Sequence, residues 1–182
     1  ADIVASEGTA GITNALGPSD PGVTRLLRVI DNAHGVRDVS VTKANYDLDP
    51  ISDRYGAKII NDGGRSYGYL NLRTFISSAN PQLRAAFLNF RNQGVTDIII
   101  DFRYNGGGLV STAELMGDLL GRNRNASELF SQTSFRPSKS GENTRHFFAT
   151  QPESIAPTRI AFIGTGSTAS ASELAINGML PY

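Results

Sequence analysis

Cysteine and tryptophan are absent from this sequence of 182 residues, and histidine occurs only twice. The absence of cysteine excludes a cysteine nucleophile, a disulfide framework and a thiolate zinc site. It leaves the redox compartment open, because an oxidising space does not require disulfides. Only His34 and His146 remain for any imidazole chemistry.

The sequence also lacks an excess of charge and any long apolar run. Because 17 Lys and Arg balance 17 Asp and Glu, no basic field exists to hold a phosphate backbone, which argues against nucleic acid as a partner. The longest apolar stretch lies inside residues 96–102, far short of the ~20 residues that a membrane helix needs. Residues 1–10 have no basic start and apolar run, so we expect any signal peptide to have been removed or to lie outside this sequence.

What the sequence does have is enough apolar residues for a packed domain, 40% of the total, and a surplus of glycine. Of the 19 glycines, seven lie at positions 63–64, 106–108, and 164 and 166. Since glycine has no Cβ, such clusters are typical of places where backbone approaches another group closely.

The first 47 residues predict a helix over residues 9–16 and a β-hairpin formed by residues 23–30 and 36–43. This unit is too small to hold a core of its own. Residues 48–57 are polar and contain a proline, which predicts a linker.

Residues 58–182 predict an α/β domain. The hydrophobic periods and the turn residues predict hairpins over 58–75 and 129–150, buried strands over 97–102 and 159–164, and helices that open at Asn80-Pro81, over 112–120 and near Ser170, the last still helical in composition at the final residues. The two buried strands each lead through a small-residue turn into a helix. We expect them to be parallel neighbours, because α/β enzymes present reactive groups at the carboxyl ends of such strands.

The first of these turns contains Gly106-Gly107-Gly108. A phosphate loop is excluded because the Walker spacing and its lysine are absent, and a dinucleotide fingerprint needs glycine where Ser111 stands. The remaining interpretations are a tight connector and a set of bare N–H groups that stabilise an oxyanion.

The second turn runs from Gly164 into the segment Thr168-Ala169-Ser170-Ala171-Ser172-Glu173. A serine between small residues at a helix start is accessible to a substrate carbonyl and gains from the helix dipole, so Ser170 is a candidate nucleophile. The same residues also match the pattern of a capping box, in which the side chain of Ser170 only binds the Glu173 amide. The sequence leaves both interpretations open.

Taken together, residues 68–75, 98–108 and 168–174, in that order and at that spacing, resemble the C-terminal processing peptidases, also called tail-specific proteases. The resemblance covers residues 58–182 and implies a Ser-Lys peptidase with a ClpP/crotonase-like α/β core, no metal or cofactor, and a location in the bacterial periplasm or cell envelope. Residues 11–43 are similar to the last helix and closing hairpin of a PDZ domain, so residues 1–47 are expected to be its C-terminal part. The implied substrate is an unfolded or C-terminal polypeptide segment bound as an extended strand.

The resemblance also implies roles for single residues. Ser170 corresponds to the nucleophile, and the amides of Ala171 and of Gly107 or Gly108 correspond to the oxyanion donors. Supporting roles fall to neighbours of these residues, with Arg103 expected to hold Asp101 or another loop group by a fork of hydrogen bonds; the supporting set is Asp101, Arg103, Asn105 and Glu173.

One departure concerns the general base. The family's lysine lies in a later segment, and the lysines present here, Lys43, Lys58 and Lys139, do not match it. We therefore interpret the chain as an internal piece of a longer peptidase that is by itself nearly inactive and prone to self-association. His146 is a weaker candidate for the base, and two other functions stay open: a non-catalytic peptide-binding module and a crotonase-like acyl-thioester enzyme.

Overall fold

The computed structural model describes residues 2–182, which divide into two compact units, Ala1–Asp47 and Leu48–Tyr182. The first unit contains helix α1 (Asp2–Leu16) and an antiparallel hairpin of β1 (Thr24–Ile30) and β2 (Val36–Thr42). Helix α1 begins earlier than predicted, with non-helical backbone at Gly8, and it ends at the predicted Leu16, just before Gly17. The hairpin confirms the predicted pair of strands.

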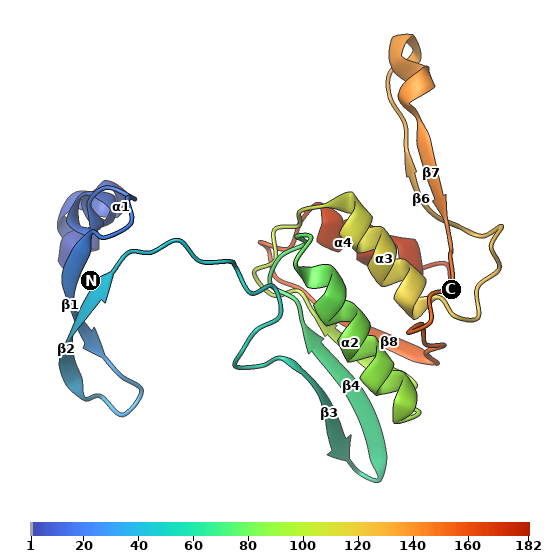
Figure 1. The fold of residues 1–182 in the computed structure, drawn as a ribbon, viewed down its shortest axis with the longest axis horizontal. Coiled ribbons are helices and arrows are strands. Elements are labelled where there is room, and N and C mark those ends of the chain that lie inside the picture. Colours follow the sequence, from blue (N-terminus) through green and yellow to red (C-terminus); the bar gives the residue numbers. More distant parts are fainter. Residues whose placement is uncertain (1) are drawn as a thin grey trace. The chain divides into compact units, whose positions relative to one another are not determined.

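The second unit is a mixed sheet with three helices and a separate hairpin (Figure 1). In chain order its elements are β3 (Ala57–Asp62), β4 (Arg65–Asn71), α2 (Ala79–Asn92), β5 (Asp97–Asp101), α3 (Val110–Leu120), β6 (Leu129–Thr133), the 3-10 helix η1 (Pro137–Glu142), β7 (Thr144–Phe147), β8 (Arg159–Ile163) and α4 (Ala171–Met179). Helix α4 ends at Met179, so the continuation of helix that the composition predicted for the last residues is wrong.

The four-stranded sheet has the order β3-β4-β5-β8. Strands β3 and β4 are antiparallel, whereas β4, β5 and β8 are parallel to one another, which confirms that the two buried strands are parallel neighbours. Because they are parallel, both end at the same edge of the sheet. The turns that follow β5 and β8 therefore leave from one edge.

The core lies between this sheet and helices α2, α3 and α4, which Figure 1 shows along one face of it. Leu70, Ile98 and Ile100 point toward the helices and are almost fully buried, since alternate residues of a strand face the same side. On α2 the buried residues Leu83, Phe87 and others form the expected apolar stripe. This packing holds the carboxyl ends of the strands in place.

Residues 50–56 are part of the second unit, where the composition had predicted a linker over 48–57. The N–H of Arg73 donates to the carbonyl of Pro50 at 2.7 Å, and the N–H of Ser52 donates to the carbonyl of Asn71 at 3.2 Å. Ile51 forms an antiparallel bridge with Leu72. Polar composition predicted a linker here, but the backbone of this segment pairs with the end of β4 and the residues that follow it.

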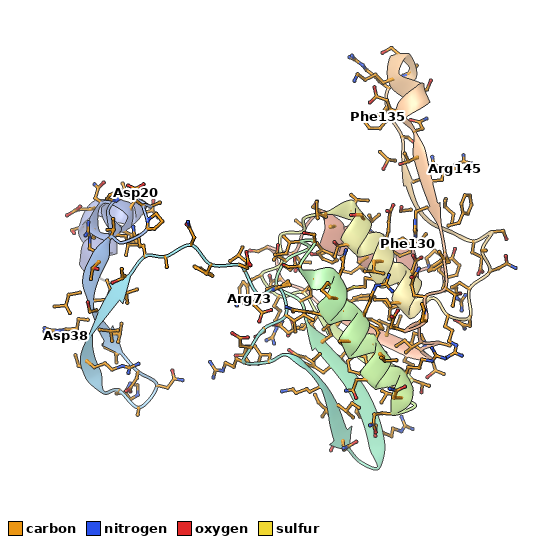
Figure 2. The ribbon with its side chains drawn as sticks, in the orientation of Figure 1. Asp20, Asp38, Arg73, Phe130, Phe135 and Arg145 are labelled. Atoms are coloured by element: carbon orange, nitrogen blue, oxygen red, sulfur yellow. The ribbon has the colours of Figure 1, made fainter. Side chains whose placement is uncertain are left out.

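Strands β6 and β7 form a hairpin that projects from the body of the second unit, with η1 at its tip (Figure 1). Figure 2 shows Phe130 at its base and Phe135 near its tip. Phe130 is buried against α3 and α4, where Gly117 and Gly178 make room for its ring. Among residues 2–182 no helix is long and apolar enough to cross a bilayer.

Candidate active site

Two turns meet at the carboxyl edge of the sheet: a glycine turn (residues 101–109) after β5 and a serine turn (residues 164–172) after β8. A Cβ atom placed on Gly107 would lie 2.6 Å from Ser170 Cβ and 2.8 Å from the nitrogen of Ala171, closer than real Cβ atoms approach. Glycine at position 107, with φ at 102°, is therefore what permits the contact. The structure brings together Gly107 and Ser170, which are 63 residues apart in the sequence.

Ser170 is the residue immediately before α4, and it is exposed. Its φ of 57° and ψ of −120° lie outside the regions that side-chain-bearing residues ordinarily occupy. Ser172 is fully buried and its hydroxyl donates to the carbonyl of Asn105, whereas Ser167 is exposed like Ser170. Burial thus excludes Ser172 as the nucleophile. The contact with Gly107 distinguishes Ser170 from the equally exposed Ser167.

Ser170 and Glu173 also have the arrangement of a capping box. The N–H of Ser170 donates to Glu173 Oε2 at 2.7 Å, while the Ser170 side chain faces the Glu173 amide without a cap hydrogen bond of normal geometry. The side chain of Ser170 leaves its backbone beside the glycine turn, because Ser170 Cβ is the nearest atom to the Cβ position of Gly107. The box anchors the backbone of Ser170 and is compatible with a reactive hydroxyl.

The backbone amides of the two turns differ in whether they are already bonded. The N–H of Gly107 donates to Asn105 Oδ1 at 2.9 Å, so it is not free for the oxyanion role that the sequence suggested for it. The N–H groups of Gly108 and Ala171 have no acceptor among residues 2–182. Of the amides that the sequence suggested as oxyanion donors, those of Gly108 and Ala171 are therefore the ones without an acceptor in the described chain.

Asn105 is fully buried between the turns. Its Nδ2 donates to the carbonyl of Leu72 at 2.9 Å, and its own carbonyl accepts from the N–H of Ala169 at 3.3 Å and from Ser172 Oγ at 3.1 Å. One residue of the glycine turn thus contacts the serine turn, the glycine backbone and the chain after β4.

Asp101 is the last residue of β5, and its buried carboxylate holds the start of the glycine turn. Arg103 donates to it from the backbone N–H and from the guanidinium, and Tyr69 Oη donates at 2.7 Å. Burial raises the pKa of Asp101, but the hydrogen bonds from Arg103 and Tyr69 outweigh it, and the net pKa is lowered. Burial and the Asp101 carboxylate raise the pKa of Tyr69 to about 12. The expected fork between Arg103 and Asp101 is present.

The lysines and His146 contact other groups. Lys58 lies over the ring of Tyr69, Lys139 pairs with Glu142, and Lys43 donates to carbonyls within the first unit. His146 is held at the base of the hairpin, with Nε2 3.0 Å from Asp118 Oδ1 and Nδ1 3.9 Å from Glu114 Oε2. Within residues 2–182 none of these side chains forms a hydrogen bond or ion pair with Ser170, and the same residues contain no cluster of three metal-ligating side chains.

Comparison with known proteins assigns the second unit to a family. The model of peptidase family S41 matches residues 66–179, more than half of the chain. The chloroplastic C-terminal processing peptidase of Tetradesmus obliquus is 27% identical over 112 residues, which are 56% of this chain and 24% of that protein. The carboxyl-terminal-processing protease of Picosynechococcus sp. is 31% identical over 75 residues, 41% of this chain and 17% of that protein. The chain thus spans about a quarter or less of these curated relatives.

Solved structures show the same fold. An S41 protease from Bacteroides fragilis has a TM-score of 0.68 at 23% identity, covering 89% of this chain and 46% of its own. The photosystem II D1 C-terminal processing protease has a TM-score of 0.55 at 20% identity, covering 80% of this chain and 37% of its own. The α/β mixed sheet with its strand-turn-helix units is therefore the fold of S41 proteases.

Proposed function

The chain belongs to peptidase family S41, and on that premise we propose that it carries the nucleophile and the oxyanion donors of a serine endopeptidase, with Ser170 as the nucleophile. One observation supports this proposal most: the strained, exposed Ser170 contacts Gly107 beside the unbonded amides of Gly108 and Ala171. A hydroxyl and two free N–H groups at one point are what acyl transfer requires.

The proposed reaction uses a lysine from a part of the longer protein outside these residues. The lysine amine takes the proton from Ser170 Oγ as this oxygen bonds to the carbonyl carbon of the substrate, and the amides of Gly108 and Ala171 bind the resulting oxyanion. When the C–N bond breaks, the lysine ammonium returns the proton to the leaving nitrogen, and an ester remains on Ser170. Water then attacks the ester with the same lysine as base, which releases the acid and restores the hydroxyl.

The backbone of the glycine turn suits an extended polypeptide substrate. The carbonyl of Gly107 accepts from the N–H of Phe75, and the N–H of Leu109 donates to the carbonyl of Phe75. The N–H of Gly108 therefore points to the opposite side of this segment. A substrate strand on that side pairs through its backbone and is read with little regard to sequence. We propose unfolded or C-terminal polypeptide segments as the substrate class.

The remaining parts of the proposal concern the longer protein. The first unit, a helix followed by a β-hairpin, is proposed as the closing part of a PDZ domain, and the bacterial periplasm or cell envelope as the location. The order α1, β1, β2 supports the first of these, because it matches the helix and closing hairpin on which the resemblance to a PDZ domain rests.

Substitution in the full-length protein tests the central claim. Ser170→Ala is expected to abolish cleavage of an unfolded polypeptide, and Ser167→Ala, an exposed serine of the same turn, is expected to retain it. By itself, the 182-residue chain is expected to cleave very slowly, because a positioned base contributes ~10²–10⁴ in rate. Cleavage by the full-length Ser170→Ala variant at the wild-type rate overturns the proposal.

A second candidate is a peptide-binding module that no longer cleaves. It is favoured by one observation, that Lys43, Lys58 and Lys139 all contact groups other than Ser170. The same experiment separates the two: a full-length protein that binds the polypeptide and never cuts it is such a module.

A further inference from the structure

We propose that Asn105 is a positioning residue that, together with the backbone of Phe75, fixes the two peptide planes flanking Gly107 and so the direction of the Gly108 amide, and that it must be uncharged to do so. The proposal rests on the proposed function, because it assigns Asn105 a part in binding the oxyanion. In the part of the chain that the structure describes, Asn105 has no hydrogen bond to Ser170, and it acts through the backbone of the glycine turn.

The orientation of two successive peptide planes supports this proposal. The carbonyl of Gly107 accepts from the N–H of Phe75 at 2.9 Å. Because the C=O and the following N–H of a trans peptide point in opposite directions, the N–H of Gly108 points away from Phe75. The preceding plane is held by the bond from the N–H of Gly107 to Asn105 Oδ1, at 2.9 Å. Phe75 and Asn105 together fix both planes that flank Gly107.

Gly107 needs this support because glycine is the residue with the greatest backbone freedom. Its φ of 102° is one of many conformations open to it. Without the Asn105 bond, the plane between Gly106 and Gly107 is free to rotate, and the Gly107 contact with Ser170 is lost with it. Asn105 therefore supplies the rigidity that a run of glycines lacks.

The contacts of Asn105 select an amide over a carboxylate. Nδ2 donates to the carbonyl of Leu72 while Oδ1 accepts from Gly107, so the side chain must offer one donor and one acceptor at fixed places. A carboxylate would set an anionic oxygen against the Leu72 carbonyl in a fully buried site. It would also place a negative charge three residues from Gly108, whose amide is proposed to bind the oxyanion, and this charge opposes the one that develops there.

The experiment compares two buried asparagines in the full-length protein. Asn105→Asp is the test, and Asn71→Asp is the matched control, since Asn71 is also buried and donates to the Asp101 carbonyl at 3.2 Å, at the start of the glycine turn, with no hydrogen bond to Gly106, Gly107 or Gly108. The readouts are kcat and KM for a peptide substrate, the affinity of a peptide aldehyde of the same sequence, which forms a tetrahedral adduct, and the melting temperature.

Asn105→Asp is expected to lower kcat roughly 100- to 1,000-fold, as loss of one oxyanion donor does, with KM unchanged. The affinity for the aldehyde is expected to fall by the same factor. Asn71→Asp is expected to lower the melting temperature with no such separation of kcat from KM. An unchanged kcat in Asn105→Asp, or an equal loss of kcat in Asn71→Asp, overturns the proposal.

Amide hydrogen exchange of the wild-type full-length protein tests whether Asn105 holds the Gly107 amide, even where a variant does not fold. The Gly107 amide is expected to be protected, and the Gly106 amide, which has no acceptor among the described residues, to exchange quickly. Equal exchange at both positions overturns the role of Asn105. If the wild type neither cleaves polypeptide nor binds the aldehyde, the proposed function fails, while the exchange pattern still shows whether Asn105 holds Gly107.

Discussion

The glycine turn and the serine turn have the same place in the fold and are built differently. Each leaves the carboxyl end of a parallel strand and leads into a helix. The glycine turn has positive φ at Tyr104, Gly107 and Gly108 and is held by the buried carboxylate of Asp101. The serine turn has positive φ only at Ser170, and the hydroxyl of Thr168 holds it by bonding the carbonyl of Phe102 at 2.9 Å.

The difference shows that one topology presents two kinds of group. Glycine lets backbone come within contact of Ser170, so the first turn exposes N–H groups. A single strained serine at a helix start exposes a side chain, so the second turn exposes a hydroxyl. Substitutions that alter the glycines or the stabilising hydrogen bonds of each turn test the comparison.

The largest effect is expected from Gly107→Ala in the full-length protein. The added methyl would lie 2.6 Å from Ser170 Cβ and 2.8 Å from the carbonyl oxygen of Ala169, which forces the turns apart. Cleavage is expected to fall roughly 1,000-fold, because small misplacements of the reacting groups are costly. The control is Gly106→Ala, whose methyl meets no atom within 4 Å, and equal rates for the two variants would contradict the contact.

Gly108→Ala is expected to lower the stability of the folded chain and not only the rate of cleavage. Its φ is 137° and the new Cβ would collide with the backbone carbonyl of Phe75. We expect the free energy of unfolding to fall by about 2–4 kcal/mol, measured by urea denaturation of the 182-residue chain. Gly166→Ala in the serine turn, where the methyl meets open space, is expected to stay within about 0.5 kcal/mol of wild type.

Asp101→Asn tests the charge that holds the glycine turn. We expect it to lower the free energy of unfolding at pH 7 by about 1–3 kcal/mol, because hydrogen bonds to a charged group are lost. The folded-state pKa of Asp101 is lowered, so the unfolded chain binds the proton first as pH falls. The contribution is therefore complete above about pH 4 and is lost as pH falls through the folded-state pKa.

Urea denaturation between pH 7 and pH 3 measures this dependence. The difference between wild type and Asp101→Asn is expected to shrink as pH falls. A difference that stays constant over this range would show that the carboxylate charge does not hold the turn.

Thr168→Val is expected to have the smallest effect. The substitution keeps the shape and removes the hydroxyl that donates to Phe102 and accepts from the N–H of Thr165 at 2.9 Å. We expect a loss of about 1 kcal/mol that does not change between pH 7 and pH 3, because no titrating group is removed. If the loss of unfolding free energy depended on pH, the glycine turn and the serine turn would not differ in being held by a charge and by a hydroxyl.

Local patterns predicted most elements of the second unit, and they predicted less well wherever a segment's partner is distant in sequence. The strands at 97–102 and 159–164, their parallel pairing and the helices after them follow from apolar runs, glycine turns and the rule for parallel strands. Residues 50–56 were predicted as a linker because their composition is polar, yet their backbone pairs with Asn71 and Arg73. Composition reports on side chains and says little about backbone partners.

The sequence by itself determined the two turns and the candidate Ser170, because small residues, a serine and a helix start are neighbours along the chain. Only the tertiary structure decided which amides remain free. The Gly107 amide is bonded and the Gly108 amide is not, since Asn105 holds one peptide plane and Phe75, 32 residues earlier than Gly107, holds the next. The direction of a glycine amide depends on such distant partners, because glycine has no conformational preference of its own to settle it.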